Sequence, residues 1–329
     1  MRPFAFVKAD TRAEAFRAIG AGSSYLAGGT TLVDLMKLDV MRPDRLVDIN
    51  ALSRDLGQIH AEPGWLRLGA LARMSQTENH PVVARDYPVL AQSLSLAASA
   101  PLRNMASLGG NVLQRTRCVY FRDTSWDACN KRDPGSGCAA LTGGNRKLAI
   151  LGGSHACIAN YPGDFAVALA ALGASVTLES AAGRRRIPFE ALHRLPGDAP
   201  HVETNLAPGE MIVEFAIPAA PWTRRSLYLK VRDRQSYEFA LVSAAVALDI
   251  EDGAVRDARI GLGGIAAKPW RAHEAEAFLK GKPLDEAHAH AAAEAALAQA
   301  VPQSESGFKP ELARATLARA LTACAAMEI

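Results

Sequence analysis

The sequence SSYLAGGTTLVDLMK, residues 23–37, decides the fold. Its first part, residues 24–27, is a short apolar run typical of a strand, and the apolar side chains of residues 32–36 recur at the spacing of a helix face. Gly28 and Gly29 stand between them. Backbone N–H groups without a Cβ in front of them, at the positive end of a helix, form a cradle for a diphosphate. The stretch is neither G-x-G-x-x-G nor a Walker loop with its lysine, so a structural turn explains it about equally well.

The residues around this stretch continue the alternation of strands and helices. Thr11 and Glu14 form a capping box ahead of a helical apolar pattern, and residues 45–49 read as a further strand. Residues 1–55 are therefore predicted to form a small α/β lobe.

Residues 56–221 are predicted to form a larger α+β lobe. A half-buried strand begins near Trp65, and Pro88 suits the first turn of a helix. The lobe is completed by a helix over 164–172, a hairpin over 175–189 and a strand over 211–217.

Residues 222–329 are predicted to form a C-terminal domain, in which Asp252-Gly253 is a strong hairpin signal. We expect a three-stranded antiparallel sheet with helices. The expected strands are 226–232, 239–250 and 255–264, and the expected helices are 272–280, 285–300 and 309–326.

Composition and charge argue against several classes of function. The 329 residues are 49% hydrophobic and 22% charged, which is ordinary for a globular protein that needs no disulfides. A net charge of +3 and an aromatic share of 6% argue against nucleic-acid binding. No apolar run approaches the roughly 18 residues of a membrane span, and charged residues interrupt the N-terminus before a signal-peptide core can form. We expect a soluble protein that is assembled in the cytoplasm.

A second glycine-rich stretch lies in the larger lobe. Residues 103–111 read RNMASLGGN, with two glycines, a hydroxyl and two amide side chains. Two such stretches on different lobes favour one long ligand in the crease between them, although two unrelated turns would give the same pattern.

Four of the five cysteines fall within residues 118–157. Four thiolates suit a [4Fe–4S] cluster or a tetrahedral zinc ion. The gaps of ten, eight and eighteen residues contain no C-x-x-C pair, so the residues alone also allow free thiols. Cys324, on a predicted Ala-rich helix, reads as a small core residue.

Together these motifs resemble the FAD-binding subunit of the xanthine dehydrogenase and molybdenum hydroxylase family. The resemblance covers nearly the whole chain, including both glycine-rich stretches, Asp164 in YPGDFAVALAALGA, Lys230 in KVRDRQSYEFALVSAAVAL, and GLGGIAAKPWRA near residue 265. It implies the two-lobed flavin fold of vanillyl-alcohol oxidase and para-cresol methylhydroxylase over residues 1–221. It also implies a C-terminal domain of the CO dehydrogenase flavoprotein type over residues 222–329.

The resemblance implies which residues contact FAD. Residues 26–32 would hold the diphosphate, Asp164 would accept hydrogen bonds from the adenosine part, and Lys230 would lie near the isoalloxazine ring, where its charge favours the anionic reduced flavin. Without the resemblance, Asp164 reads as a helix N-cap and Lys230 as a surface cation. The expected cofactor-binding residues are Tyr25, Leu26, Ala27, Gly28, Gly29, Thr30, Thr31, Leu32, Asn104, Ser107, Gly110, Asn111, Arg122, Asp164, Ile212 and Lys230.

Residues 112–160 form a segment that most flavin subunits of this family lack. It is similar to an insertion in the FAD subunit of periplasmic aldehyde oxidoreductase, through LQRTRC, CNKR and PGSGCAAL. That likeness implies a [4Fe–4S] cluster, and the flavin subunit of 4-hydroxybenzoyl-CoA reductase, which carries a cluster in an insertion, is an alternative relative. The implied ligands are Cys118, Cys129, Cys138 and Cys157.

The resemblance implies an electron-transfer subunit with no catalytic residue of its own. Its partners would be a large molybdenum-cofactor subunit, which oxidises an aldehyde to a carboxylic acid, and a small subunit with two [2Fe–2S] clusters. Electrons would then pass through FAD to an external acceptor. A partner's signal peptide could carry the folded complex to the periplasm. A free-standing vanillyl-alcohol-type FAD oxidase and a zinc-loop assembly protein are the alternatives from other classes.

Overall fold

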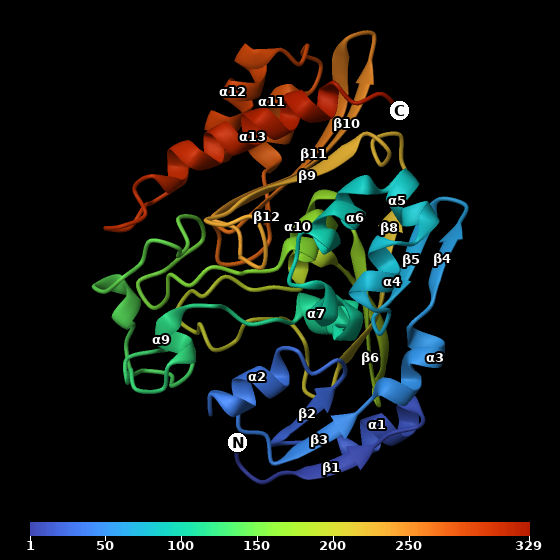
Figure 1. The fold of residues 1–329 in the computed structure, drawn as a ribbon, viewed down its shortest axis with the longest axis vertical. Helices are drawn as coiled ribbons and strands as arrows, with labels where there is room; N and C mark the ends of the chain where they lie inside the picture. Colours follow the sequence, from blue (N-terminus) through green and yellow to red (C-terminus); the bar gives the residue numbers. More distant parts are fainter.

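The small N-terminal lobe follows the order expected from the sequence. The computed structural model describes residues 1–329, and its first five elements alternate strand and helix (Figure 1). They are β1 (Ala5–Lys8), α1 (Arg12–Ala18), β2 (Ser23–Leu26), α2 (Leu32–Lys37) and β3 (Arg45–Asp48). The strands form a parallel sheet in the order β1-β3-β2. Thr11 caps α1 by accepting the Glu14 N–H at 3.2 Å, as its position in the capping box predicts.

The larger lobe is built on a five-stranded antiparallel sheet in the order β4-β5-β8-β6-β7. Its strands are β4 (Ile59–Glu62), β5 (Trp65–Gly69), β6 (Ser175–Ser180), β7 (Gly183–Pro188) and β8 (Met211–Pro218). One face of β8 packs Met211 and Val213 against the small lobe, and Ile212 and Phe215 belong to the main core on the other side. The pairing of β6 with β8 shifts register between Ile212 and Glu214, and this irregularity places Phe215 on the same side as Ile212, so that one strand joins the two lobes.

Short helices complete this lobe, most of them on the core side of the sheet (Figure 1). They are α3 (Ser53–Leu56), α4 (Met74–Glu78), α5 (Pro81–Asp86), α6 (Pro88–Ser95), α7 (Ala100–Met105), α8 (Leu108–Val112), α9 (Val119–Arg122) and α10 (Asp164–Ala171). All eight residues of α10 are buried. A helix that is apolar all round lies at the centre of a protein, and α10 lies between the larger lobe and the C-terminal sheet.

The C-terminal domain has four strands, so the prediction of three was incomplete. The strands are β9 (Ser226–Val231), β10 (Val242–Glu251), β11 (Ala254–Gly263) and β12 (Trp270–Arg271), in the order β12-β11-β10-β9. The additional strand is only two residues long, which is too short for any periodicity to reveal. Three helices follow: α11 (His273–Leu279), α12 (Glu286–Ala296) and α13 (Lys309–Ala325).

The C-terminal sheet is buried on both faces. Along β10, Ala244 and Val246 face the helices α11–α13, whereas Ala245 and Ala247 face the core of the larger lobe. A strand covered on both sides reads as a continuous apolar run, as residues 244–248 do.

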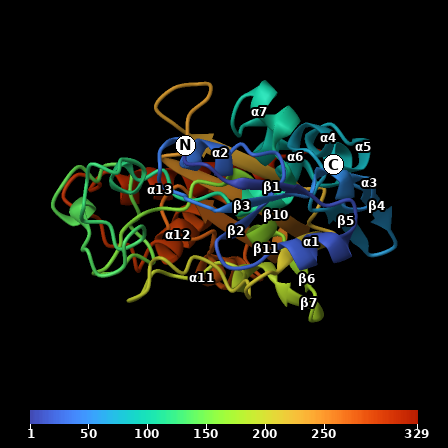
Figure 2. The same ribbon diagram turned by 90° about the horizontal axis from the view of Figure 1, so that it is seen from below.

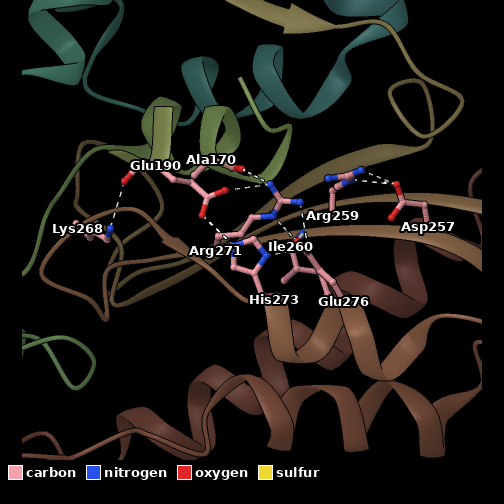
Figure 3. A network of polar contacts seen from close by, with 9 residues as sticks. All are labelled: Ala170, Glu190, Asp257, Arg259, Ile260, Lys268, Arg271, His273 and Glu276. Carbon is pink, nitrogen blue, oxygen red and sulfur yellow. Dashed lines mark hydrogen bonds and ion pairs between the residues drawn. The ribbon is translucent and has the colours of Figure 1, made fainter. Parts of the chain in front are cut away.

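A polar network joins the C-terminal domain to the larger lobe (Figure 3). The buried Arg271 guanidinium donates to the Ala170 carbonyl at 3.1 Å and also contacts the carboxylates of Glu190 and Glu276. His273 contacts Glu190 as well, at 2.9 Å. One arginine thus links the end of α10, the segment after β7 and the first turn of α11.

Residues 112–160 form an irregular segment that projects to one side of the molecule (Figures 1 and 2). It contains only α9 and a 3₁₀ turn over Ala139–Leu141, and it packs a small core of its own around Phe121 and Leu148. No helix in the structure is long and apolar enough to cross a membrane.

Candidate functional site

The first glycine-rich stretch contacts the second one directly. A Cβ placed on Gly28 would lie 2.0 Å from the Met105 carbonyl oxygen, so only glycine fits at this crossing of the two lobes. Gly29 has a φ of +72°, which glycine adopts without strain. The N–H groups of residues 28–31 donate to no protein acceptor. Unpaired N–H groups at a strand-to-helix turn fit the predicted diphosphate cradle.

The second stretch is more helical than the sequence suggests. Ser107 caps α8 by accepting the Gly110 N–H at 3.2 Å, so Gly109 and Gly110 lie in a short helix rather than a loop. Asn104 belongs to α7 and is exposed outside the cavities described below, so the structure does not bring it to the cradle.

A cavity of about 860 Å³ opens in the crease between the two lobes. This volume lies within the range of about 300–1,000 Å³ that is typical of cofactor sites. Ten of the residues predicted to bind the cofactor line it: Tyr25, Ala27, Gly28, Gly29, Thr30, Thr31, Leu32, Ser107, Gly110 and Ile212. The Tyr25 hydroxyl donates to the Gly209 carbonyl at 2.9 Å, and burial raises the pKa of Tyr25 to about 12. Tyr25 is therefore a neutral wall of the cavity.

A second cavity of about 210 Å³ adjoins the first, since Thr30 and Thr31 line both. It is also lined by Asn111, whose buried Oδ1 has no hydrogen-bond partner in the protein. Because buried polar atoms are rarely left unpaired, this oxygen marks a place for a polar ligand group.

Asp164 and Lys230 both line the second cavity and form a buried ion pair at 2.8 Å. Asp164 is the first residue of α10 rather than its N-cap, which is Gly163. Burial raises the pKa of Asp164, and the Lys230 ammonium and the Tyr228 hydroxyl oppose that rise. Because the two side chains contact each other, they cannot lie at opposite ends of an extended FAD, as their implied roles require.

Two further predicted residues lie beside the cavities rather than in them. Leu26 ends β2 and packs near Gly29, and Arg122 donates to Asp34 on α2 at 2.9 Å. Arg117, which was not among the residues predicted to bind the cofactor, lines the second cavity and stacks on Phe239 with its guanidinium carbon 4.9 Å from the ring centroid. Its position near Cys118 gave no signal, because the contact joins residues 122 positions apart.

The four cysteines of the irregular segment line one small cavity of about 10 Å³. All are free thiols, and Cys118, Cys129 and Cys157 are buried. Burial raises the pKa of Cys118 to about 11 and raises that of Cys157. Gly135 and Gly137, at φ of +92° and +98°, form the turn between Cys129 and Cys138.

The predicted metal site is not formed as a set of ligands in this structure. No three His, Cys, Asp or Glu side chains come close enough to hold a metal ion. A single zinc ion would require neighbouring sulfurs about 3.8 Å apart, from Zn–S bonds of about 2.3 Å. A cluster of iron and sulfide is larger and holds its thiolates further apart. The donor set fits a thiolate-ligated cluster or a zinc ion by its chemistry, and the structure preforms the site of neither.

Hydrogen bonds from side chains to main-chain carbonyls hold the cysteine segment in place. Arg132 donates to the carbonyls of Tyr120 and Phe121 at 2.6 and 3.0 Å, and Asn130 donates to the Ala156 carbonyl at 3.0 Å. These bonds connect the chain around Cys118, Cys129 and Cys157, which are far apart in sequence.

The comparisons with known proteins agree with this fold and site. Residues 2–220 match the FAD binding domain in molybdopterin dehydrogenase, and residues 227–329 match the CO dehydrogenase flavoprotein C-terminal domain. The chain therefore belongs to the FAD-binding medium subunits of the molybdenum hydroxylases.

Several members of this family are similar over the whole chain. The aldehyde oxidoreductase FAD-binding subunit PaoB of Escherichia coli (strain K12) is 45% identical over 98% of both chains. The carbon monoxide dehydrogenase medium chain of Hydrogenophaga pseudoflava is 25% identical over 93% of this chain and 90% of its own.

Among solved structures, carbon monoxide dehydrogenase from Hydrogenophaga pseudoflava superposes with a TM-score of 0.76 at 25% identity, over 99% of this chain and 98% of that one. Quinoline 2-oxidoreductase from Pseudomonas putida 86 also gives 0.76, at 24% identity, over 98% and 97% of the two chains. The fold expected from the family resemblance is thereby confirmed.

Proposed function

We propose that this chain is the FAD- and [4Fe–4S]-containing electron-transfer subunit of an aldehyde-oxidising molybdenum hydroxylase. The observation that carries the proposal is the pair of adjoining cavities in the crease between two lobes, with unpaired N–H groups of residues 28–31 at their junction. The 45% identity to an aldehyde oxidoreductase subunit over 98% of the chain supports the choice of substrate class.

In this proposal, residues 28–31 hold the diphosphate of FAD and Ser107 fixes the turn of α8 beside it. Asn111 offers its unpaired Oδ1 to the flavin side, where Lys230 provides positive charge and Asp164 holds Lys230 in place. Bound FAD supplies the capacity to take electrons singly and to release them as a pair. No side chain in either cavity needs to act as a general base.

The four cysteines would hold the [4Fe–4S] cluster. Their support is that four free thiols line a single cavity inside a segment that hydrogen bonds from side chains to main-chain carbonyls tie together. A cluster there supplies one-electron redox capacity. The segment projects from the body of the molecule (Figure 2), so a cluster in it either relays electrons or braces the segment.

The partners proposed for this subunit are a large molybdenum-cofactor subunit and a small subunit with two [2Fe–2S] clusters, in a heterotrimer. Medium chains of the family carry that name because they belong to multi-subunit enzymes. We further propose cytoplasmic assembly followed by export of the folded complex on a partner's signal peptide.

The spectrum of the anaerobically purified chain tests the proposal. We expect flavin bands above a broad absorption that bleaches with dithionite, together with about four iron atoms per chain. Cys129→Ala should remove the iron and the broad absorption but leave the flavin. Cys324→Ala is the matched control, because Cys324 is a buried thiol in the C-terminal core. A colourless chain that cannot be reconstituted with FAD would refute the flavin assignment, and flavin without iron would refute the cluster.

A further inference from the structure

An arginine without a carboxylate partner contacts residues next to both glycine-rich stretches. Arg73 precedes α4 and is half-buried, and its guanidinium donates to the Met105 carbonyl and to Asn50 Oδ1 at 3.0 Å. Burial lowers its pKa, and no neighbouring carboxylate opposes that effect. A partly buried cation normally has a counter-charge, so the charge of Arg73 is unbalanced within this chain.

Asn50 extends this contact to the first glycine-rich segment. Its Nδ2 donates to the Ala27 carbonyl at 2.9 Å and to Asp48 Oδ1 at 2.6 Å. Ala27 is the residue directly before Gly28. Because the C=O and N–H of a planar trans peptide point in opposite directions, holding the Ala27 carbonyl toward Asn50 turns the Gly28 N–H the other way. That N–H has no acceptor in the protein.

The same arginine fixes the second segment. The Met105 carbonyl that accepts from Arg73 is the atom that crosses Gly28 so closely that no Cβ fits between them. Arg73 also pairs with Ser107 in an isolated bridge, next to the cap of α8. Arg73 and Asn50 therefore hold two carbonyls, one on each lobe: that of Met105, two residues before Ser107, and that of Ala27, directly before Gly28.

We propose that Arg73 and Asn50 act as a clamp that sets the two glycine-rich segments for FAD, with the diphosphate as the counter-charge of Arg73. Both are positioning residues, since neither lines the large cavity. The inference rests on the proposed FAD site and adds to it the pair that orients its N–H groups. The sequence gives no motif for this pair, because its members are 23 residues apart on different lobes.

The test is the affinity of the FAD-stripped full-length chain for FAD, followed by quenching of flavin fluorescence. We expect Arg73→Met to raise the Kd for FAD about tenfold or more, the range for losing hydrogen bonds made by a charged group. Arg73→Lys should recover part of the affinity, because it keeps the charge but cannot bridge two acceptors. Asn50→Ala should weaken FAD binding too, and the double variant should lose less than the sum of the two effects. Arg85→Met, an exposed arginine on α5 paired with Asp86, is the matched control.

The melting temperature of the apo chain separates the possible outcomes. The clamp is supported if Arg73→Met weakens FAD binding while the apo melting temperature stays close to that of the parent. It is overturned if Arg73→Met binds FAD as tightly as the parent does. It is also overturned if the substitution lowers the melting temperature of the apo form and of the FAD-bound form by the same amount. If the parent chain itself binds no FAD, the proposed function fails, and the clamp fails with it. If Arg73→Met does not fold, the affinity of Asn50→Ala decides by the same criteria.

Discussion

Asp164 on α10 and Lys230 on β9 are joined by a buried ion pair of 2.8 Å that crosses from the larger lobe to the C-terminal domain. Tyr228 donates to the second Asp164 oxygen at 2.8 Å, and Lys230 also donates to the Leu96 carbonyl at 3.0 Å. The pair borders the smaller cavity, so one interaction both connects two domains and sets the charge beside the proposed flavin site.

Removing one partner of this pair should destabilise the protein strongly. Asp164→Asn or Lys230→Met leaves a buried charge without its partner, and we expect a loss of about 3–5 kcal/mol in the free energy of unfolding. The double variant should lose less than the sum of the two single losses. Chemical denaturation of each variant measures these terms.

The control for this cycle is the exposed pair of Arg2 and Asp39, whose side chains are 58% and 39% exposed. Arg2→Met and Asp39→Asn should each leave the free energy of unfolding almost unchanged, because water and salt screen an exposed pair. Additive losses for Asp164 and Lys230 would contradict a direct coupling between them.

Gly28→Ala should prevent the two lobes from meeting correctly. The added Cβ would lie 2.0 Å from the Met105 carbonyl oxygen, and backbone atoms on both sides cannot give way as a side chain can. We expect a chain purified without FAD and a melting temperature lowered by several degrees. Gly20→Ala is the control, because Gly20 lines the same cavity and its Cβ would meet nothing within 4 Å. Full FAD content in Gly28→Ala would show that the crossing is not needed.

The sequence was informative where the determinant is local. The N-cap at Thr11, the turn at Gly29 and the hairpin at Asp252-Gly253 each depend on a few adjacent residues, and the structure has all three, although the Glu14 side chain accepts from the Asp10 N–H rather than from that of Thr11. The C-terminal helices were predicted for the same reason. The two-residue strand β12 was missed, because its only signal is pairing with Gly261 and Leu262 of β11.

The site was less predictable because its contacts join distant residues. The cradle residues could be named from their pattern, but nothing in the sequence showed that Met105 crosses Gly28 or that Arg73 reaches Asn50. Asp164 and Lys230 were expected as cofactor contacts, yet their mutual contact spans 66 positions and only the fold brings it about. Asn104 was chosen for its amide within a motif, and helix α7 turns that amide to the solvent.

The stability of the chain should fall between pH 7 and pH 5 because of His193. Burial lowers the pKa of His193 to about 4, below its ordinary value of 6.5. In that interval the unfolded chain binds a proton that the folded chain does not, so stability is lost as the pH falls through the unfolded pKa. The expected loss from this group is about 2 kcal/mol over those two pH units.

His193→Gln isolates this contribution to the pH dependence. The His193 ring contacts the Val112 carbonyl at 3.0 Å, and glutamine keeps a donor for that carbonyl without titrating. Denaturation curves at pH 7 and pH 5 should differ by about 2 kcal/mol less for the variant than for the parent. Equal differences in the two proteins would mean that His193 is not the titrating group.

Arg271 should be the residue on which the attachment of the C-terminal domain depends most. Its side chain is 4% exposed and bonds to Glu276, Glu190 and the Ala170 carbonyl at once (Figure 3). Arg271→Met would leave these acceptors facing an apolar group, and we expect a loss of about 3–5 kcal/mol. Arg256→Met is the control, because Arg256 lies on β11 of the same sheet and its side chain is 59% exposed.

The part of the chain that Arg271→Met destabilises first shows whether Arg271 links two domains or supports the packing of the whole protein. If Arg271 mainly joins the domains, Arg271→Met should increase amide hydrogen exchange in β12 and α11 before it does so in the small lobe, which makes no contact with it. Glu190→Gln removes a partner on the larger lobe and should produce the same pattern at lower amplitude. Uniform acceleration of exchange throughout the chain would show that the residue supports the fold as a whole rather than this one interface.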